Sequence, residues 1–146
     1  MKRNFDPKRA IDGTWGEMYL DGEQVRETTA LSLKVQMNFQ DVPMCGTWAK
    51  QKKSAGWEGS GSVTMTKTNS RMAILLADEI KEGRMPEFTI ISALKDKDAF
   101  GHERVVVKGV QFSELTLADW ASNKVGEVTL PFTFTDFDFL DMIEPQ

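Results

Sequence analysis

The chain has 146 residues, enough for one domain with a hydrophobic core but too few to expect two. It is 40% hydrophobic and 27% charged, as ordinary soluble globular proteins are, and its net charge of −4 argues against a dedicated nucleic-acid-binding protein, whose surface is usually basic. With one cysteine, no apolar run near the ~20 residues of a membrane span and no apolar segment behind the basic N-terminus, the sequence favours a protein made and kept in a cytoplasm.

The first predicted elements are an irregular arm and a hairpin. We expect residues 1–12 to be an irregular N-terminal arm, and residues 14–20 to form a strand. Asp21-Gly22 then suits a tight turn, because both central residues of such a turn need positive φ. We therefore expect residues 23–40 to return alongside residues 14–20 as the second arm of this hairpin.

The alternation in residues 23–40 is the strongest pattern in the chain. Side chains of a strand point alternately to opposite faces, so apolar odd positions and polar even positions predict one buried face and one wet face. The apolar odd positions are Val25, Leu31, Leu33, Val35, Met37 and Phe39. Strands usually run about 5–6 residues, so a strand this long should be one arm of a projecting or strongly curved ribbon.

Residues 41–56 have no clean period and are predicted to be a long loop. Pro43, Gly46 and Gly56 interrupt any regular element there. Compact domains rarely contain structureless loops beyond ~12–15 residues unless the loops are functional or disordered. Disorder is one interpretation, but Met44 and Trp48 are costly to leave exposed. We therefore favour a loop that becomes ordered against a partner.

The middle of the chain predicts a strand followed by a helix. Residues 57–67 alternate again, and Gly59 and Gly61 on the apolar face indicate a bulge or a close approach of another group. Residues 69–83 then change to helical spacing, with an apolar stripe and Gly83 as a stop signal. The members of the stripe are Met72, Ala73, Leu76, Ala77 and Ile80.

The last third of the chain predicts three more strands and an acidic tail. The predicted strands are residues 87–96, residues 103–112 with a bulge at Gly109, and residues 125–134; they are separated by a turn at 97–101 and a packed connector at 113–124. Residues 135–146 read as an exposed acidic C-terminal tail. With about six strands joined by hairpins, the fold class is mainly β (α+β): an antiparallel β-sandwich or open barrel with one flanking α-helix, in a single domain.

Residue types that carry chemistry are sparse, and each has a simpler interpretation. His102 lies at a turn with no second histidine, and Cys45 has no nearby base, so neither predicts a metal or nucleophilic site. The aspartates of the tail, Asp136, Asp138 and Asp141, lack the glycine and distal glutamate of a calcium loop. We predict no catalytic constellation, no cofactor and no metal.

Three segments taken together resemble the tail tube (core) proteins of contractile phage tails, in particular those of PBSX-type defective prophages of Gram-positive bacteria. The segments are GTWGEMYLDGEQV, GSGSVTMTKTNSRM and VQFSELTLADWASNKVGEVTLPFTF. The resemblance covers about residues 11–140. Its motifs are structural rather than catalytic, so the resemblance rests on their order and spacing along the chain.

The resemblance implies a fold like that of phage and type VI secretion tube proteins, and a non-enzymatic role. Subunits of this family form hexameric rings that stack into a hollow tube inside a contractile sheath. The implied partners are further copies of the chain, the sheath protein, the tape-measure protein and baseplate or hub proteins. DNA would be a passenger that is not tightly bound, and no membrane is involved. The protein would lie in the tail of a virion or phage-like particle assembled in the bacterial cytoplasm.

Two sets of residues are candidates for these roles. The resemblance implies that the loop at residues 41–56 reaches the next ring, and its aromatic anchor and basic charge fit a binding contact. The loop candidates are Met44, Trp48, Lys50, Lys52 and Lys53. A lumen that passes DNA should be acidic or neutral, because each phosphate neutralised by a lysine or arginine adds affinity that would slow the polymer. The candidates facing the lumen are Glu27, Glu58 and Glu127.

Two functions of other classes stay open at this point. One is a small-ligand-binding β-barrel that works as a monomer, and the other is a metal-independent hydrolase whose site is assembled from distant residues. A size that grows with protein concentration separates the tube protein from both. Whether the parent particle is a complete phage, a defective prophage or a bacteriocin also stays open.

Overall fold

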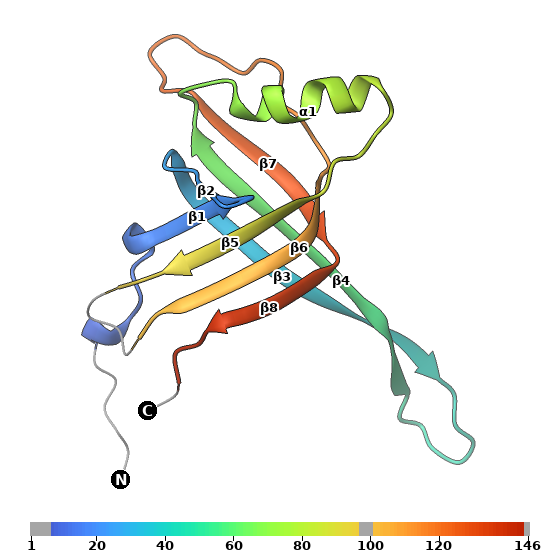
Figure 1. Ribbon diagram of the computed structural model, residues 1–146. Helices are drawn as coiled ribbons and strands as arrows, with labels where there is room; N and C mark the ends of the chain where they lie inside the picture. Colours follow the sequence, from blue (N-terminus) through green and yellow to red (C-terminus); the bar gives the residue numbers. More distant parts are fainter. Residues whose placement is uncertain (1–6, 97–100, 145–146) are drawn as a thin grey trace.

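A computed structural model describes residues 7–96 and 101–144, and these residues form antiparallel β-sheet with one α-helix (Figure 1). The strands are β1 (Gly16–Leu20), β2 (Glu23–Gln24), β3 (Thr28–Val42), β4 (Gln51–Thr66), β5 (Phe88–Leu94), β6 (Glu103–Phe112), β7 (Glu127–Phe134) and β8 (Asp136–Asp141). The helix α1 spans Arg71–Lys81, and two short 3-10 turns span Pro7–Arg9 and Gly13–Trp15.

The strands form two sheets that share β6. One sheet has the order β2-β1-β5-β6-β8, and the other has the order β6-β7-β4-β3, in which only the end of β6 pairs with β7. The two sheets face each other across the core, and α1 covers one end (Figure 1). The predicted fold class is confirmed, with the open rather than the closed form of the barrel, because β3 and β8 do not pair with each other.

The core fills the space between the sheets with side chains from β1, β4, α1, β5, β6 and β7, and with Val25 from the connection between β2 and β3. The buried residues include Met18, Val25, Val63, Met65, Met72, Leu76, Ile90, Val107, Val110, Leu130, Phe132 and Phe134. The predicted alternation holds on β3 where the core reaches it, since Leu31, Leu33 and Val35 pack against this cluster. Beyond Val35 the same alternation continues without a core, and Met37 and Phe39 are exposed.

The first hairpin is shorter than predicted. Asp21 and Gly22 both have positive φ and form the predicted two-residue turn, but only Glu23 and Gln24 pair with β1. The chain then leaves this sheet, with the Val25 N–H bonded to the Met18 carbonyl at 2.9 Å and the Val25 side chain buried in the core. The expectation that residues 23–40 return along residues 14–20 is wrong, because β5 takes the other edge of β1 and β3 pairs with β4.

Half of the predicted loop at residues 41–56 is strand, since residues 41–42 end β3 and residues 51–56 begin β4. β3 and β4 stay paired out to Val42 and Gln51, so only residues 43–50 connect them at the end of a projecting hairpin (Figure 1). The register shifts by one residue between Met37 and Phe39, and Gly56 has a φ of +102° at the extra residues on β4. This bulge breaks the period, and the hairpin has no buried face outside the core, so no alternation marks these residues as strand.

The helix agrees closely with the predicted segment 69–83. Met72 and Leu76 are buried against the sheets, and Gly83 has the positive φ of a helix stop. The Asn69 side-chain oxygen accepts a hydrogen bond from the Arg71 N–H at 3.0 Å. Ile80 belongs to the predicted apolar stripe but is half exposed.

The C-terminal segment is a strand rather than a free acidic tail. β8 pairs with β6 across residues 104–108, and Phe137 packs edge-on against Trp57 with ring centroids 5.4 Å apart. Its aspartates face outward, where Asp138 lies 3.6 Å from Lys108 and Asp141 lies 3.5 Å from Arg104. With β2 and β8 added, the described residues contain eight strands instead of about six.

Gly109 forms the predicted bulge in β6. Its φ is +67°, and the pairing register with β5 shifts beside it. The strand bends there, so that its first part pairs with β5 and β8 while Gln111 and Phe112 pair with β7. The predicted turn at 97–101 and the first six residues of the predicted arm lie outside the described residues, apart from Gly101.

Candidate functional site

One surface of the sheet β3–β4–β7 is covered by small hydroxyl side chains. Odd residues of β4 and even residues of β7 point into the core, so the alternate residues form the opposite, outer surface. We call this surface the polar face; it comprises Ser32, Lys34, Gln36, Glu58, Ser60, Ser62, Thr64, Thr66, Glu127, Thr129 and Thr133. The hydroxyls of Thr64 and Thr129 lie 3.2 Å apart across the two strands.

The polar face is almost neutral. Its charged members are Lys34, Glu58 and Glu127, and all three are exposed; Glu127 lies at one end of the β4–β7 pairing and Glu58 lies just beyond the other end. A surface of serine and threonine offers a polymer weak, exchangeable hydrogen bonds and few fixed charges. Two of the three predicted lumen residues therefore lie on this one surface.

Glu27, the third predicted lumen residue, lies elsewhere. It precedes β3, its side chain is only 10% exposed, and its carboxylate lies 3.2 Å from Nε of Arg71 at the start of α1. Glu23 approaches the same guanidinium at 3.7 Å. Glu27 thus links α1 to the segment between β2 and β3, where the chain passes from one sheet to the other. It does not belong to the polar face.

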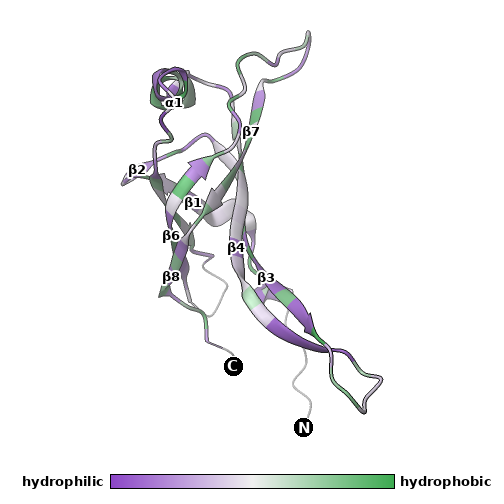
Figure 2. Ribbon diagram, turned by 90° about the vertical axis from the view of Figure 1, so that its right-hand side faces the viewer, coloured by the Kyte–Doolittle hydropathy of each residue, from purple (hydrophilic) through white to green (hydrophobic). Residues whose placement is uncertain are grey.

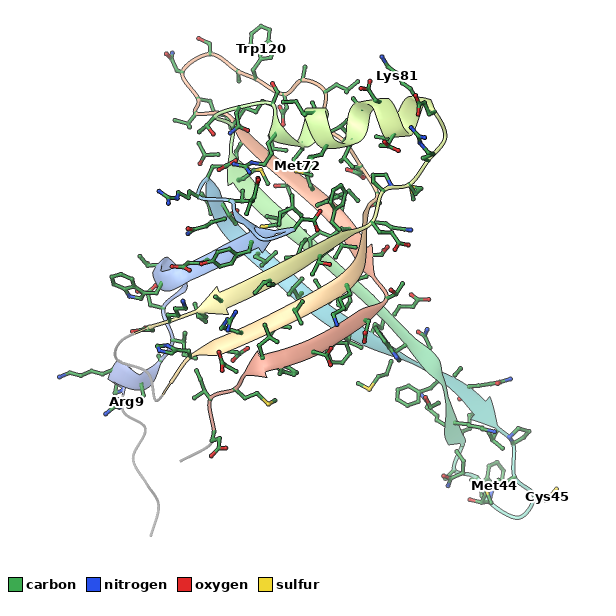
Figure 3. All side chains as sticks on the ribbon, viewed as in Figure 1. Arg9, Met44, Cys45, Met72, Lys81 and Trp120 are labelled. Atoms are coloured by element: carbon green, nitrogen blue, oxygen red, sulfur yellow. The ribbon has the colours of Figure 1, made fainter. Side chains whose placement is uncertain are left out.

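The second candidate surface is the end of the projecting hairpin, residues 39–54, which we call the hairpin tip. Every residue in it is exposed, and Trp48 is completely so. Figure 3 shows Met44 and Cys45 at its far end. All the predicted ring-contact residues lie within it: Met44, Trp48, Lys50, Lys52 and Lys53. Lys52 sits opposite Asp41 in the strand register, so three lysines and one aspartate give the tip a net positive charge.

An apolar groove at the other end of the molecule was not found by sequence reasoning. It has a volume of about 420 Å³ and is lined by the last turns of α1, the turn after it, and the connector that follows β6. Its apolar walls are Leu76, Ile80, Met85, Phe112, Leu115 and Leu117. No signal in the sequence pointed to it, because Ile80 reads as part of the apolar stripe of the helix and the connector has no period that would assign Leu117 to a surface.

Residues with catalytic or metal-binding chemistry stay apart in the fold. Across residues 7–96 and 101–144, no three His, Cys, Asp or Glu side chains gather as metal ligands would. Cys45 is exposed at the hairpin tip and His102 is exposed before β6. Within the same residues no helix has the length and hydropathy to cross a membrane.

Comparison with known proteins shows what the chain is similar to. The chain is 32% identical over 133 residues to phage-like element PBSX protein XkdM of Bacillus subtilis (strain 168), covering 90% of each chain. In fold it is similar to the tube-terminating cap of the anti-feeding prophage, with a TM-score of 0.73 and 14% identity over 96% of this chain and 97% of that one.

A second solved structure has the same fold. A chain of the PVC extracellular contractile injection system, in its sheath–tube complex in the extended state, matches with a TM-score of 0.66 and 12% identity, covering 93% of this chain and 95% of that one. The family model described as phage tail tube protein matches residues 3–141. The chain belongs to the phage tail tube protein family.

Proposed function

We propose that this chain forms the inner tube of a contractile phage or phage-like tail, by closing into hexameric rings that stack on one another. The observation that carries the proposal is the outer edge of β3. This strand has 15 residues and, among the described residues, pairs with β4 alone, so its other side presents a long row of backbone N–H and C=O groups that no described strand takes up. An edge of this length invites pairing with another chain, and closure of a ring removes it.

The polar face suits the inner wall of such a tube. A sheet continued from copy to copy through the edge of β3 would carry its hydroxyl-rich surface around a common axis. A DNA phosphate would meet Lys34 as the only cation of this surface, with Glu58 and Glu127 to oppose it. The wall would therefore let DNA and a tape-measure protein pass without holding either.

The role is structural and needs no cofactor. In a tail, the subunit would contact the sheath around the tube, the tape-measure protein inside it, and baseplate or hub proteins at its end. The similarity to a chain from a sheath–tube complex supports the first of these contacts. Assembly in the host bacterial cytoplasm, and residence in the finished tail, follow from the same proposal.

The fold does not support the alternative function, a β-barrel that binds a small ligand. Phe132 and Leu130 fill the interior, and the gap of about 370 Å³ between β3 and β8 opens to solvent where the two sheets diverge. A barrel that holds a small molecule instead encloses a cavity within closed sheet.

Negative-stain electron microscopy of the concentrated protein, together with sedimentation velocity over a range of concentrations, tests the proposed function. Rings or tubes in the images and a sedimentation coefficient that rises with concentration are expected. A protein that stays monomeric up to millimolar concentration and forms no tubes would contradict the proposal.

A further inference from the structure

The gap between β3 and β8 has apolar walls that the described residues leave open to water. Its volume is about 370 Å³, and the apolar walls are Leu31, Leu33, Val35, Val105, Val107, Phe134, Phe137 and Phe139. Figure 2 shows the sheets edge-on, with β6 and β8 on one side and β3 and β4 on the other. Phe139 lines this gap and is 48% exposed. A segment that filled the gap would stabilise the subunit by removing apolar surface from water.

One side of the gap ends in an open strand edge. Among the described residues β8 pairs with β6 alone, so its other edge presents backbone N–H and C=O groups that no described strand takes up. Such an edge accepts an extended segment, which gains main-chain hydrogen bonds and places alternate side chains in the pocket beside the edge. Because β8 has six residues, a short segment is enough to cover it.

The part of the chain that precedes the described residues begins beside this gap. Residues 1–6 join Pro7, and the arm after Pro7 is held at the end of β5, where the Asp12 N–H donates to Oδ2 of Asp96 at 2.8 Å. Leu94 in the same strand pairs with Glu103, which lines the gap. Figures 1 and 3 place Arg9 and the start of β6 at the same end of the molecule. Six extended residues reach about 20 Å, so residues 1–6 can enter the gap of their own copy.

The composition of residues 1–6 matches the gap. They read MKRNFD, and in an extended segment Arg3 and Phe5 share one face. Phe5 supplies a phenyl ring for the apolar walls, and Arg3 supplies a cation for Glu103. This carboxylate has no ion-pair partner among the described residues. Lys34, the one cation among the residues that line the gap, belongs to β3 and not to the β6 side.

We propose that residues 1–6 of each copy lie in the gap of the same copy, along the open edge of β8, with Phe5 against the apolar walls and Arg3 paired with Glu103. The segment covers the edge of β8, so that β3 is left as the long strand edge open to another copy. The contact is made within one subunit. It goes beyond the proposed function and does not depend on whether the subunits form a tube.

A disulfide in place of the Arg3–Glu103 pair tests the contact. The variant Arg3→Cys/Glu103→Cys is made with Cys45→Ser, so that it has two thiols, and is studied at concentrations where sedimentation shows monomers. Arg104→Cys replaces Glu103→Cys in the matched control. Arg104 is the next residue of β6 and points to the opposite face, where it lies 3.5 Å from Asp141. Equilibration with oxidised and reduced glutathione, followed by mass spectrometry, gives the effective concentration of the two thiols.

We expect an effective concentration at least tenfold higher for Arg3→Cys/Glu103→Cys than for the control, because a flexible tether alone gives both pairs similar values in the millimolar range. Equal values would show that the segment does not occupy the gap. Mixed single-cysteine variants, Arg3→Cys with Glu103→Cys, test the other occupant. Disulfides that form only between copies, and not within dilute monomers, would assign the segment to a neighbouring copy and overturn the inference.

A hydrophobic dye gives a second readout that needs no cysteine. Phe5→Ala should open the apolar walls and raise the fluorescence of anilinonaphthalene sulfonate several-fold over the wild type, while Asn4→Ala, on the other face of the extended segment, should not. Wild-type protein that binds the dye as strongly as Phe5→Ala would mean that the gap is empty, and the inference would be wrong. If the preferred disulfide forms but microscopy shows no tubes, this contact stands and the proposed function fails.

Discussion

The ring of Phe132 packs closely against Gly61, its partner in the register of β7 and β4. A Cβ built on Gly61 would come within 2.8 Å of this ring and would also press on the backbone carbonyl of Ser32 in β3. Phe134 covers Gly59 in the same way two residues along. The two glycines therefore leave space for two buried phenyl rings. Without this space, the rings could not fill the core where β4 pairs with both β3 and β7.

Gly61→Ala should lower the free energy of unfolding by about 1–3 kcal/mol, because the added methyl group forces either the ring or the β3 backbone to move. Chemical denaturation monitored by circular dichroism measures this. Gly13→Ala is the control, since nothing lies within 4 Å of a Cβ there and its φ is not positive. Equal stability of Gly61→Ala and the wild type would mean that the ring does not rest on the glycine.

The same pair shows what sequence reasoning could reach. Alternation predicted an apolar face for residues 57–67, on which the structure buries Val63 and Met65, and two glycines on that face indicated either a bulge or a close approach. The choice between them required the partner strand, and the partner of β4 at this point is β7, about 70 residues away in the chain. Periodicity reports which way a side chain points but says nothing about which strand lies beside it.

The two main errors, in β3 and in β8, have different origins. The pattern of β3 was correct for Leu31 to Val35, but its pairing was assigned to the nearest strand in sequence, and the switch between sheets at Val25 left no local signal. In β8, Phe137 and Phe139 alternate with aspartates as a half-buried strand should, but the acidic charge of the segment concealed that alternation. The residues of the hairpin tip could be predicted as a contact surface without knowing the strand pairing, because a tryptophan and three lysines in a segment without period are a local signal.

The ion pair of Arg71 with Glu27 should contribute more to the free energy of unfolding than an exposed ion pair does. The Glu27 side chain is 10% exposed, so Arg71→Ala leaves a nearly buried carboxylate without its cation. We expect a loss of about 1–3 kcal/mol, between the values for exposed and fully buried pairs. Thermal and chemical denaturation measure it.

Arg84→Ala is the matched control for this prediction. Arg84 pairs with Glu79 and Glu82 on the outer side of the helix end, where its side chain is 64% exposed. Its removal should change stability by at most about 0.5 kcal/mol, because exposed pairs contribute little. Equal losses from Arg71→Ala and Arg84→Ala would show that Glu27 stays hydrated.

Removal of the hairpin end should prevent assembly without unfolding the subunit. Residues 43–50 can be replaced by Asn-Gly, which connects paired strands in a two-residue turn, because Val42 and Gln51 are already opposite each other. The shortened chain keeps all of its core, so its unfolding midpoint should match that of the wild type. It should sediment as small species at concentrations where the wild type forms tubes; normal tubes would mean that the tip is not the stacking element.

Within the tip, Trp48 should carry most of the binding energy. Trp48→Ala removes a side chain that is completely exposed in the subunit, so the monomer should keep its stability, and the critical concentration for assembly should rise at least tenfold. Trp120→Ala is the matched control, because Trp120 is 86% exposed but lies on the connector, outside the hairpin tip. Light scattering against concentration compares the two, and a similar rise from both would contradict the anchor role of Trp48.

A lysine placed on the polar face should turn the tube into a DNA-binding surface. Thr133 is exposed on β7 and lies opposite Ser60, so Thr133→Lys puts a cation among hydroxyls without disturbing the core. In a hexameric ring the substitution occurs six times at one level, and each phosphate neutralised steepens the dependence of log affinity on log salt by about 0.9 for duplex DNA.

Wild-type tubes should therefore retain little duplex DNA even at low salt, while Thr133→Lys tubes should bind it with a steep salt dependence in a gel-shift or co-sedimentation assay. Ile74→Lys is the control, since Ile74 is 78% exposed on α1, outside the polar face, and adds the same charge. DNA bound inside the tube should also be protected from nuclease, whereas DNA held by the Ile74→Lys surface should be digested. Tight binding of duplex DNA by wild-type tubes, or equal protection of DNA from nuclease by both variants, would contradict the proposal that the polar face lines the lumen.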